Sequence, residues 1–335
     1  MKARLRDAAF LSLASCVVAS LVACTSGDSG ATNGAQAPAP REHLTLGVAT
    51  LRISLPLFLA QEQHLFAAHG LDVEVRPYET AQPMIDDVVA GRVDAAGFAA
   101  YPIVFLASQG ASEPPQIATN LVEDAQHRLS YVLARKDSGL AFPANASGKR
   151  IGVLPTVAYR RWLDAILRAA QIDPAIVTIV PVAPPMQAQT LAEGGVDMMF
   201  TGDPMASAML ASGRAEIIDD GPPCAKRLGD PFDFGTFVLS SALARDRPEA
   251  ARLLVAAVDD AIERTRRDPA AARRAMGAHL RPAERAFVER YPETAHQASR
   301  EVADGLLARE IAAETRLGII ERAPRLRAWT PAGAH

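Results

Sequence analysis

A strand–helix–strand pattern near the start of the predicted folded region limits the architectures open to this chain. Residues 44–50 form a short run typical of a strand. Residues 55–69 carry apolar side chains at helical spacing, and Gly70 stands where glycine commonly ends a helix. Residues 71–78 alternate in polarity, which is typical of a second strand. A strand, a helix and a strand within about 35 residues predict two parallel strands joined by a crossover helix.

The same pattern starts again in the second part of the chain. A strand, a helix and a strand are predicted at residues 150–154, 156–170 and 177–182. The two series also share a corner, Gly91-Arg92-Val93-Asp94 in the first and Gly194-Gly195-Val196-Asp197 in the second. Glycine ends a helix there without a steric penalty, and aspartate starts the next strand. Two unrelated corners are the alternative, but their equivalent places favour a pseudo-symmetric pair of α/β lobes.

The order of predicted elements also suggests where the lobes begin and end. Residues 234–240 are an apolar run, predicted to be a strand that returns to the first lobe, and helices follow it. We therefore expect lobe one to comprise residues 43–137 and 234–322, and lobe two residues 146–222. Residues 323–335 are predicted to be a loose tail. A body of about 310 residues is too long for one small core, which agrees with two lobes.

The N-terminus is built like an export signal. Three basic residues precede a nearly all-apolar stretch, residues 8–22, which is too short and wrongly flanked for a comfortable transmembrane helix. Leu21-Val22-Ala23-Cys24 resembles the lipobox of bacterial lipoproteins, which implies that residues 1–23 are a removed signal peptide and that Cys24 is lipidated. An ordinary signal with a chance cysteine is the alternative. Residues 24–42 are rich in small and polar residues and are predicted to be a flexible tether.

Charge and cysteine content exclude several classes of protein. The net charge of −3 becomes about −5 without the signal, so the chain lacks the basic footprint of a nucleic-acid-binding protein. No second apolar run of about 18 residues follows, so we expect a soluble body held to a membrane only through its lipid. Cys224 has no partner for an intramolecular disulfide and no Cys/His cluster accompanies it. We predict no metal site and no cofactor.

Motifs of the common catalytic sites are missing from the sequence. It has no G-x-S-x-G, no Ser-x-x-Lys, no H-E-x-x-H and no glycine-rich phosphate loop. His64 and His69 are five residues apart on a predicted helix, so they do not share a face that would hold a metal. We therefore expect that the protein is not an enzyme.

Several ordered segments resemble the substrate-binding proteins of the nitrate, sulfonate, taurine and thiamine-precursor ABC importers. Residues 56–66 match the family pattern P-x-x-x-A-x-x-x-G-L-F, with His64 in place of the usual glycine, and G-L-D-V follows at residues 70–73. Residues 90–96 match the recurrent G-x-V-D stretch, and residues 148–153 match G-K-x-I-G-V. The resemblance covers roughly residues 44–268.

This resemblance implies a type II periplasmic-binding-protein fold, in which two α/β lobes are joined by a two-segment hinge and close on a ligand. It implies capture of a small polar organic solute, such as a sulfonate, a taurine-like compound or a pyrimidine or other nitrogen compound, and delivery to an ABC permease with its ATPase. We expect a monomer in the cell envelope, lipid-anchored to a bacterial membrane and facing the periplasm or the cell exterior. A ligand-binding sensor or adaptor lipoprotein that signals to a membrane partner is the alternative.

Candidate ligand-binding residues follow from the rule that ligands of open parallel sheets lie beyond the carboxyl ends of the strands. Backbone N–H groups at the helix N-termini there are unpaired and favour acceptor atoms. Four loops meet this rule, and their candidate residues are Arg52, Ile53 and Ser54; Ala100 and Tyr101; Thr156, Val157 and Ala158; and Gly202 and Asp203.

Four of these residues have chemistry suited to a ligand, and each has a plainer alternative. Arg52 is suited to a carboxylate, sulfonate or phosphate, or else belongs to a surface ion pair or a solvated loop. Tyr101 contacts the ligand or packs in the core. Thr156 caps a helix and faces the cleft. Asp203 binds an amine or ring N–H, or only caps the helix begun by Pro204. If both charges reach the ligand, a small organic molecule with opposite polar ends fits best.

Overall fold

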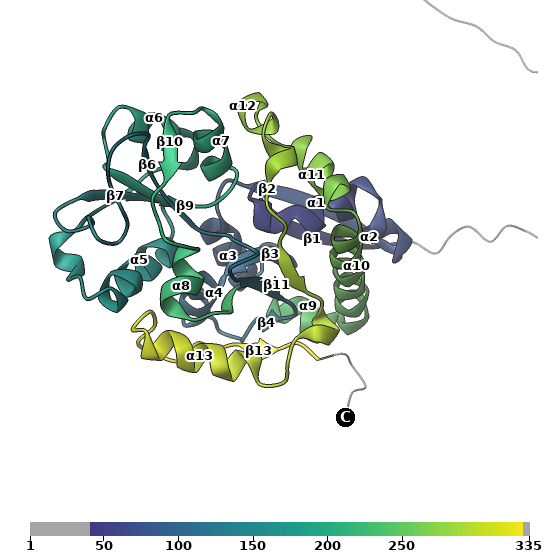
Figure 1. Ribbon diagram of the computed structural model, residues 1–335. Coiled ribbons are helices and arrows are strands. Elements are labelled where there is room, and N and C mark those ends of the chain that lie inside the picture. The colour runs from purple at the N-terminus through teal and green to yellow at the C-terminus, as the bar shows by residue number, and fades with distance from the viewer. Residues whose placement is uncertain (1–40, 331–335) are drawn as a thin grey trace, which may run out of the picture. The chain divides into compact units, whose positions relative to one another are not determined.

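The structure is a computed structural model that describes residues 41–330, and within them the chain forms two β-sheets and their surrounding helices (Figure 1). The strands of the larger sheet are β1 (Glu42–Ala49), β2 (Leu71–Tyr78), β3 (Ala95–Ala100), β4 (Gln116–Ile117), β5 (Asn120–Glu123), β11 (Phe232–Leu239), β12 (Ala295–Gln297) and β13 (Arg327–Ala328). The strands of the smaller sheet are β6 (Tyr131–Arg135), β7 (Arg150–Val153), β8 (Thr178–Pro181), β9 (Met198–Thr201) and β10 (Ala215–Ile217).

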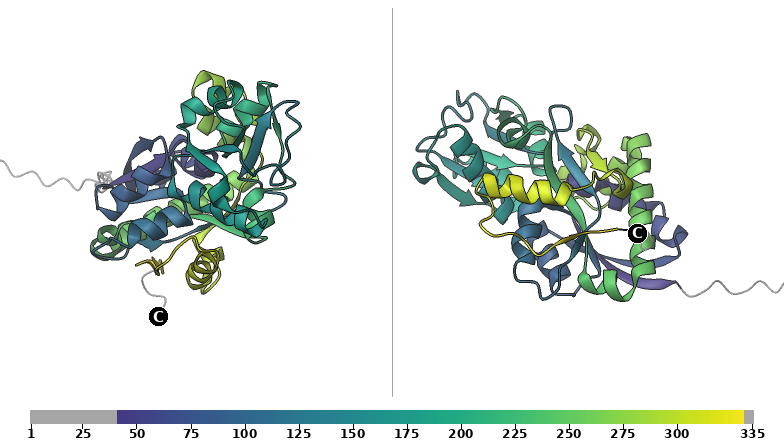
Figure 2. Two further views of the ribbon diagram at one scale, coloured as in Figure 1. Left: turned by 90° about the vertical axis from the view of Figure 1, so that its left-hand side faces the viewer. Right: turned by 90° about the horizontal axis from the view of Figure 1, so that it is seen from below.

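Helices connect these strands and extend the chain beyond them. They are α1 (Leu55–Glu62), α2 (Leu65–Ala68), α3 (Ala81–Val89), α4 (Tyr101–Ser108), α5 (Val157–Ala169), α6 (Gln187–Ala192), α7 (Met205–Ala211), α8 (Pro223–Leu228), α9 (Ser241–Asp246), α10 (Pro248–Arg267), α11 (Pro269–Gly277), α12 (Pro282–Arg285) and α13 (Leu306–Arg316). A short 3-10 helix, η1 (Arg52–Ser54), precedes α1. Helix α13 lies on the outside of the structure in both views of Figure 2.

The two sheets share one strand order, which confirms the predicted pair of α/β lobes. The larger sheet contains the order β2-β1-β3-β11-β5, and the smaller has β8-β7-β9-β6-β10. In each, the first three strands are parallel and the fourth is antiparallel. We call the part of the chain around the larger sheet lobe one and the part around the smaller sheet lobe two. The fold is thus the two-lobed α/β architecture expected from the sequence.

Hydrogen bonds at the two G-x-V-D corners confirm that the corners are equivalent. In lobe one, the Thr45 N–H donates to the Asp94 carboxylate over 2.7 Å, and the Asp94 N–H donates to the Thr45 carbonyl over 2.9 Å. In lobe two, Arg150 and Asp197 make the same two bonds over 2.9 and 2.8 Å. In each lobe the aspartate side chain accepts a backbone N–H of the central parallel strand, β1 or β7, while its own backbone N–H donates to the same residue of that strand.

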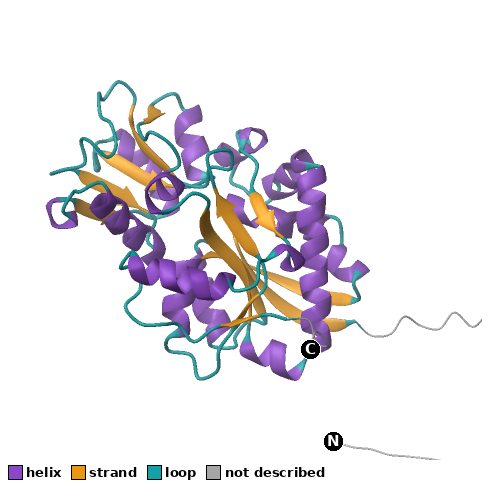
Figure 3. Cartoon of the chain, turned by 60° about the horizontal axis from the view of Figure 1, so that its bottom comes forward, coloured by secondary structure: helices purple, strands orange, loops and turns teal. Residues whose placement is uncertain are grey.

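Two segments of the chain cross between the lobes, and each leads into the antiparallel strand of the sheet it enters. Residues 124–130 lead from β5 to β6, and residues 218–231 lead from β10 to β11. Figure 3 shows the strands in two separate groups. The crossing strands thus give each lobe one strand that enters directly from the other.

The two crossing segments are tied to each other by a buried carboxylate. Glu123 accepts hydrogen bonds from the N–H groups of Leu129 at 2.8 Å, Ser130 at 2.5 Å and Ala225 at 3.0 Å. Its side chain is fully buried, and this burial raises the pKa of Glu123 while the three N–H donors lower it. Because the donors come from both segments, Glu123 holds them together at the junction of the lobes.

The predicted helix over residues 55–69 is broken into α1 and α2. His64 lies at the break with a φ of +54°, in the left-handed region. L-residues with a side chain are strained in that region, whereas glycine enters it freely. The break therefore explains why the resembling family usually has glycine at this position, where this chain has His64.

The predicted loose tail is held in place as far as the structure describes it. Arg327–Ala328 forms β13, which pairs in parallel with β4, and the Trp329 N–H donates to the Ile117 carbonyl over 2.8 Å. The Arg325 guanidinium also bonds to the Ala111 carbonyl. Backbone pairing, which the polar composition of the segment does not reveal, thus attaches residues 325–329 to lobe one.

The predictions for the N-terminus lie largely outside the described residues. These are the signal peptide, the lipid on Cys24 and the tether as far as residue 40. Strand β1 begins at Glu42, the last residue of the predicted tether. Between residues 41 and 330, none of the helices is both long and apolar enough to cross a membrane. The exact boundaries of the two lobes stay predictions.

Candidate functional site

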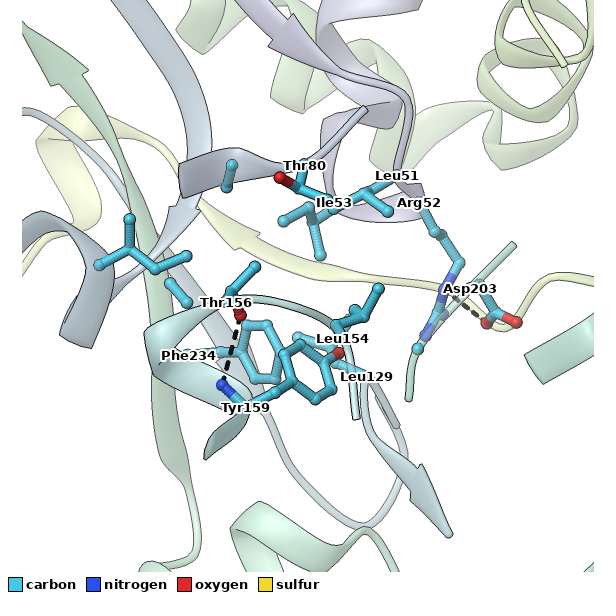
Figure 4. A pocket seen from close by; sticks show the side chains of 14 residues that line it. Leu51, Arg52, Ile53, Thr80, Leu129, Leu154, Thr156, Tyr159, Asp203 and Phe234 are labelled. Atoms are coloured by element: carbon cyan, nitrogen blue, oxygen red, sulfur yellow. Dashed lines mark hydrogen bonds and ion pairs between the residues drawn. The ribbon is translucent and has the colours of Figure 1, made fainter. Parts of the chain in front are cut away.

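A cavity of about 40 Å³ lies between the two lobes. Figure 4 shows Thr80 and Ile53 of lobe one across it from Thr156 and Tyr159 of lobe two. Its walls come from the loops that follow β1, β2, β3, β7 and β9, together with α4, α5, β11 and the first crossing segment. The described residues that line it are Leu51, Arg52, Ile53, Thr80, Ala81, Ala100, Ile103, Leu129, Leu154, Thr156, Tyr159, Gly202, Asp203 and Phe234. The carboxyl ends of parallel strands therefore meet at this cavity.

The cavity is small for a solute. A water molecule needs roughly 10–15 Å³ of such space, so about three waters would fill it. A second, more open hollow of about 360 Å³ shares Leu51 with it. A molecule of more than a few heavy atoms would need the lobes to move apart before it could enter the inner cavity.

Six of the ten predicted ligand-binding residues line the cavity. They are Arg52, Ile53, Ala100, Thr156, Gly202 and Asp203. All four predicted loops contribute at least one of them, so the rule about strand ends correctly located the cavity. Whether these six residues contact a solute stays a prediction.

The other four predicted residues do not line the cavity. Tyr101 is fully buried on α4, and its hydroxyl bonds to the Asn120 side chain at 3.1 Å, so it packs in the core. The Ser54 hydroxyl is buried and donates to the Gly97 carbonyl over 3.4 Å. Val157 and Ala158, in the first turn of α5, are not among the lining residues. The first turn of a helix presents its side chains in several directions, so adjacency in sequence did not bring these residues to the cavity.

Arg52 and Asp203, expected to meet opposite ends of a ligand, instead pair with each other. Their side chains are 1% and 0% exposed, and Arg52 Nε lies 2.9 Å from Asp203 Oδ2. The Arg52 N–H also donates to the Asp203 carbonyl over 3.2 Å. Since Arg52 lies on η1 of lobe one and Asp203 follows β9 of lobe two, the pair joins the lobes at one side of the cavity (Figure 4).

The helix caps predicted beside the cavity are present. Thr156 Oγ1 accepts the Tyr159 N–H at 3.4 Å, so Thr156 caps α5 while lining the cavity. Asp203 Oδ1 accepts the Ser207 N–H at 2.9 Å in the first turn of α7. Asp203 thus takes the predicted capping role and also pairs with Arg52, a contact that the sequence did not indicate.

Three hydroxyl groups are the uncharged polar side chains that line the cavity within the described part of the chain. They belong to Thr80, Thr156 and Tyr159. Burial raises the pKa of Tyr159 well above its usual value, so its hydroxyl stays neutral at physiological pH. A hydroxyl can both donate and accept a hydrogen bond, so this lining suits a ligand group of either kind.

Sequence reasoning missed eight lining residues. Most are apolar, and they are Leu51, Thr80, Ala81, Ile103, Leu129, Leu154, Tyr159 and Phe234. Leu51 and Leu154 adjoin predicted site residues and were within reach of the same rule. Phe234 had no such signal, since an apolar residue in a strand is ordinarily core, and its ring packs 4.6 Å from the Trp162 ring of α5.

The described residues offer no metal-binding cluster and no catalytic constellation at the cavity. Between residues 41 and 330, no three His, Cys, Asp or Glu side chains are placed to hold a metal ion together. The described lining includes no histidine, cysteine or lysine. Cys224 is fully buried on α8, and burial raises the pKa of its thiol well above its usual value. The cavity is thus equipped for hydrogen bonding and apolar contact.

Solved structures with the same fold include periplasmic binding proteins, and also DszB, which was crystallised in complex with biphenyl-2-sulfinic acid. The alkanesulfonate-binding protein SsuA of Xanthomonas axonopodis, bound to MOPS, aligns with a TM-score of 0.68 and 17% identity over 87% of this chain and 99% of its own. The aliphatic sulphonate-binding protein SsuA of Escherichia coli gives 0.69 and 16% over 88% and 94%. The nitrate-binding protein NrtA of Synechocystis gives 0.64 and 17% over 88% and 83%. At this identity the likeness establishes the fold.

Sequence comparison gives the family. A search of curated proteins finds no match. The model of the NMT1-like family matches residues 37–280, which include most of lobe one, all strands of lobe two and every residue that lines the cavity. On that match, and with the fold it shares with periplasmic binding proteins, this chain belongs to the NMT1-like family.

Proposed function

We propose that this protein is an extracytoplasmic solute-binding lipoprotein, which captures a small molecule between its lobes and delivers it to an ABC importer permease. The observation that carries the proposal is the cavity where the strand ends of both lobes meet, in a molecule whose lobes are joined by two crossing segments. A two-lobed molecule with such a junction can close on a ligand by hinge motion. The permease would then distinguish the closed, loaded form from the open one.

The lining of the cavity supports binding rather than catalysis. Among the described residues, its polar side chains are hydroxyls and one ion pair, and none is arranged as a nucleophile beside a base. Hydroxyls of this kind orient a solute and leave it unchanged.

Solute binding is tested first by thermal unfolding and calorimetry of a protein that starts at Thr25. The protein is unfolded and refolded to remove any bound solute, then screened against sulfonates, taurine, nitrate, pyrimidines and other small nitrogen compounds. A ligand at 100 times its dissociation constant stabilises the folded form by about 2.7 kcal/mol, a readily measured shift. Ile53→Trp is the control, because Ile53 lines the cavity and is only half-buried, so the larger ring fills the space. A shift that survives in this variant would place binding elsewhere.

The lipid anchor is tested on Cys24. In cells that process lipoproteins, the wild-type protein is expected in the membrane fraction and Cys24→Ser in the soluble fraction of the envelope. Equal membrane association of the two proteins would contradict lipidation at Cys24.

Import is separated from sensing by following a radiolabelled solute found in the screen. Loss of its accumulation in a strain without the gene supports the importer. Unchanged accumulation with loss of a transcriptional response would instead favour the sensor or adaptor.

A further inference from the structure

The charges at the cavity are already balanced within the protein. Arg52 and Asp203 are the two charged residues among the described residues that line it, and both are almost fully buried. Because they form an ion pair with each other, the cavity carries no net charge from its lining. A charged ligand would therefore meet no unpaired opposite charge while Arg52 and Asp203 are in contact.

The carboxylate of Asp203 has no acceptor position left for a ligand. Its Oδ1 accepts the Ser207 N–H at 2.9 Å and the Ser207 hydroxyl at 2.6 Å. Its Oδ2 lies 2.9 Å from Arg52 Nε and accepts the Tyr131 hydroxyl at 3.3 Å. A carboxylate offers about four lone-pair sites, so the four contacts use its capacity. An amine or ring N–H of a solute would have to displace one of them.

The guanidinium of Arg52 is held by one ion pair and two hydrogen bonds, although its buried Nε–H makes no hydrogen bond. Its Nη1 donates to the Pro292 carbonyl over 2.9 Å, and its Nη2 donates to the Arg128 carbonyl. These two bonds reach the segment before β12 and the first crossing segment, and the ion pair of Nε with Asp203 reaches lobe two. The Arg52 side chain is only 1% exposed. Turning its guanidinium toward an anion would break its contacts with the segment before β12, the first crossing segment and lobe two.

The rest of the lining is apolar or hydroxylic. Aliphatic side chains and the Phe234 ring supply the apolar wall, and Thr80, Thr156 and Tyr159 supply hydroxyls. Burying an ion among such groups is unfavourable without a compensating charge, whereas an apolar body with one or two hydrogen-bonding groups loses little on entry.

We propose that the solute is uncharged, with a mainly apolar body and one or two polar groups that meet the hydroxyls of Thr80, Thr156 and Tyr159. This inference rests on the proposed solute-binding function. It departs from the sulfonates and nitrate named for the structural relatives, because both of those are anions. The Arg52–Asp203 pair then serves as a neutral contact between the lobes and excludes anions from the site.

The first test uses pairs of compounds that match in shape and differ in charge. Benzenesulfonate is compared with benzenesulfonamide, and butanesulfonate with butyl methyl sulfone, by calorimetry with the ligand-free wild-type protein at neutral pH. We expect the uncharged member to bind at least ten-fold more tightly than its anion. Tighter binding of a sulfonate overturns the ligand class and leaves the proposed solute-binding function standing.

The second test does not depend on the natural solute. Asp203→Asn leaves Arg52 without its counter-ion, so this variant is expected to gain benzenesulfonate binding at least ten-fold over the wild type. Arg52→Gln/Asp203→Asn, without either charge, is the matched control and is expected to gain none. A folded Asp203→Asn protein with no gain overturns the proposal.

The outcomes distinguish the exclusion of anions from the binding of these particular probes. If the wild type binds neither member of a pair while Asp203→Asn gains the sulfonate, exclusion of anions is supported and only the binding of these probes is contradicted. If Asp203→Asn does not fold, as judged by circular dichroism, the wild-type comparison of charged and uncharged partners decides alone.

Discussion

The ion pair between the lobes gives a quantitative prediction for stability. Asp203→Asn leaves the Arg52 guanidinium buried without a counter-ion, and breaking a buried pair by removing one partner costs about 3–5 kcal/mol. The asparagine oxygen can still accept the Ser207 N–H, and Arg52 keeps the carbonyls of Pro292 and Arg128. We therefore expect the lower end of that range, a loss of about 3 kcal/mol in the free energy of unfolding.

A double-mutant cycle in urea measures this loss and its origin. The variants are Asp203→Asn, Arg52→Met and the two combined, where methionine keeps an unbranched apolar chain in the space of the arginine stem. Each single variant leaves one charge buried, whereas the double variant leaves none. We expect the double variant to recover to within about 1 kcal/mol of the wild type, because well-packed neutral replacements of a buried pair are often tolerated. The loss in the single variants corresponds to a melting shift of roughly 6–12 °C, at about 2–4 °C per kcal/mol.

Two results would refute this reasoning. A loss below 1 kcal/mol in Asp203→Asn would mean that solvent reaches the guanidinium and that the pair is not buried in solution. Losses that simply add in the double variant would mean that the two side chains are not coupled, since independent sites give additive changes.

Three further changes have expected outcomes. His64→Gly removes the strain of a left-handed residue and should raise the free energy of unfolding by roughly 0.5 kcal/mol. This is the strain relief of about 1–2 kcal/mol minus the entropic cost of ordering a glycine on folding. A lower free energy of unfolding in a urea titration would contradict the strain. Gly202→Ala would place a Cβ 2.8 Å from the Tyr159 hydroxyl and should lower the free energy of unfolding by about 1–3 kcal/mol. The control Gly110→Ala, whose Cβ lies 3.9 Å from its nearest atom, should lower it far less. Equal effects of the two variants in thermal melts would show that the cavity wall shifts to accept the methyl group. Burial, with nearby Asp233, raises the pKa of Glu310 from 4.5 to about 8, so the folded form holds a proton that the unfolded chain releases. The stability of the wild type relative to Glu310→Gln should therefore be greatest below about pH 4.5 and fall by up to about 1.4 kcal/mol per pH unit as the pH rises toward 8. Urea titrations across that range measure this difference. A difference that does not change with pH would show that Glu310 is not buried.

Local sequence signals predicted the framework of the fold well because each depends on neighbouring residues. Helical spacing and strand alternation located β1, α5 and most strands of both sheets, since burial of one face imposes its period on the sequence. The G-x-V-D repeat predicted equivalent corners, and the paired hydrogen bonds of Asp94 and Asp197 confirm them. The strand-end rule then located the cavity, because it follows from the direction of parallel strands alone.

The same local reasoning failed where a residue's partner lies far along the chain. His64 reads as part of a helix, and only its backbone conformation shows the break. The composition of the segment after residue 323 predicts a loose tail, and only its pairing with β4 shows that it is attached to the larger sheet. For the tail, the spacing along the sequence carries no record of this contact, and for His64 the helical spacing continues across the break in the backbone.

The candidate site shows most clearly which features local sequence patterns predict and which depend on tertiary packing. Local sequence patterns were enough to predict two α/β lobes, the loops that meet between them and the positions of Arg52 and Asp203 in those loops. It could not determine that these two charges face each other, because 150 intervening residues form the rest of both lobes and their packing alone sets the distance. Tertiary structure thereby turned two apparent ligand-binding charges into a neutral contact between lobes, since buried opposite charges within reach of each other are stable only as a pair.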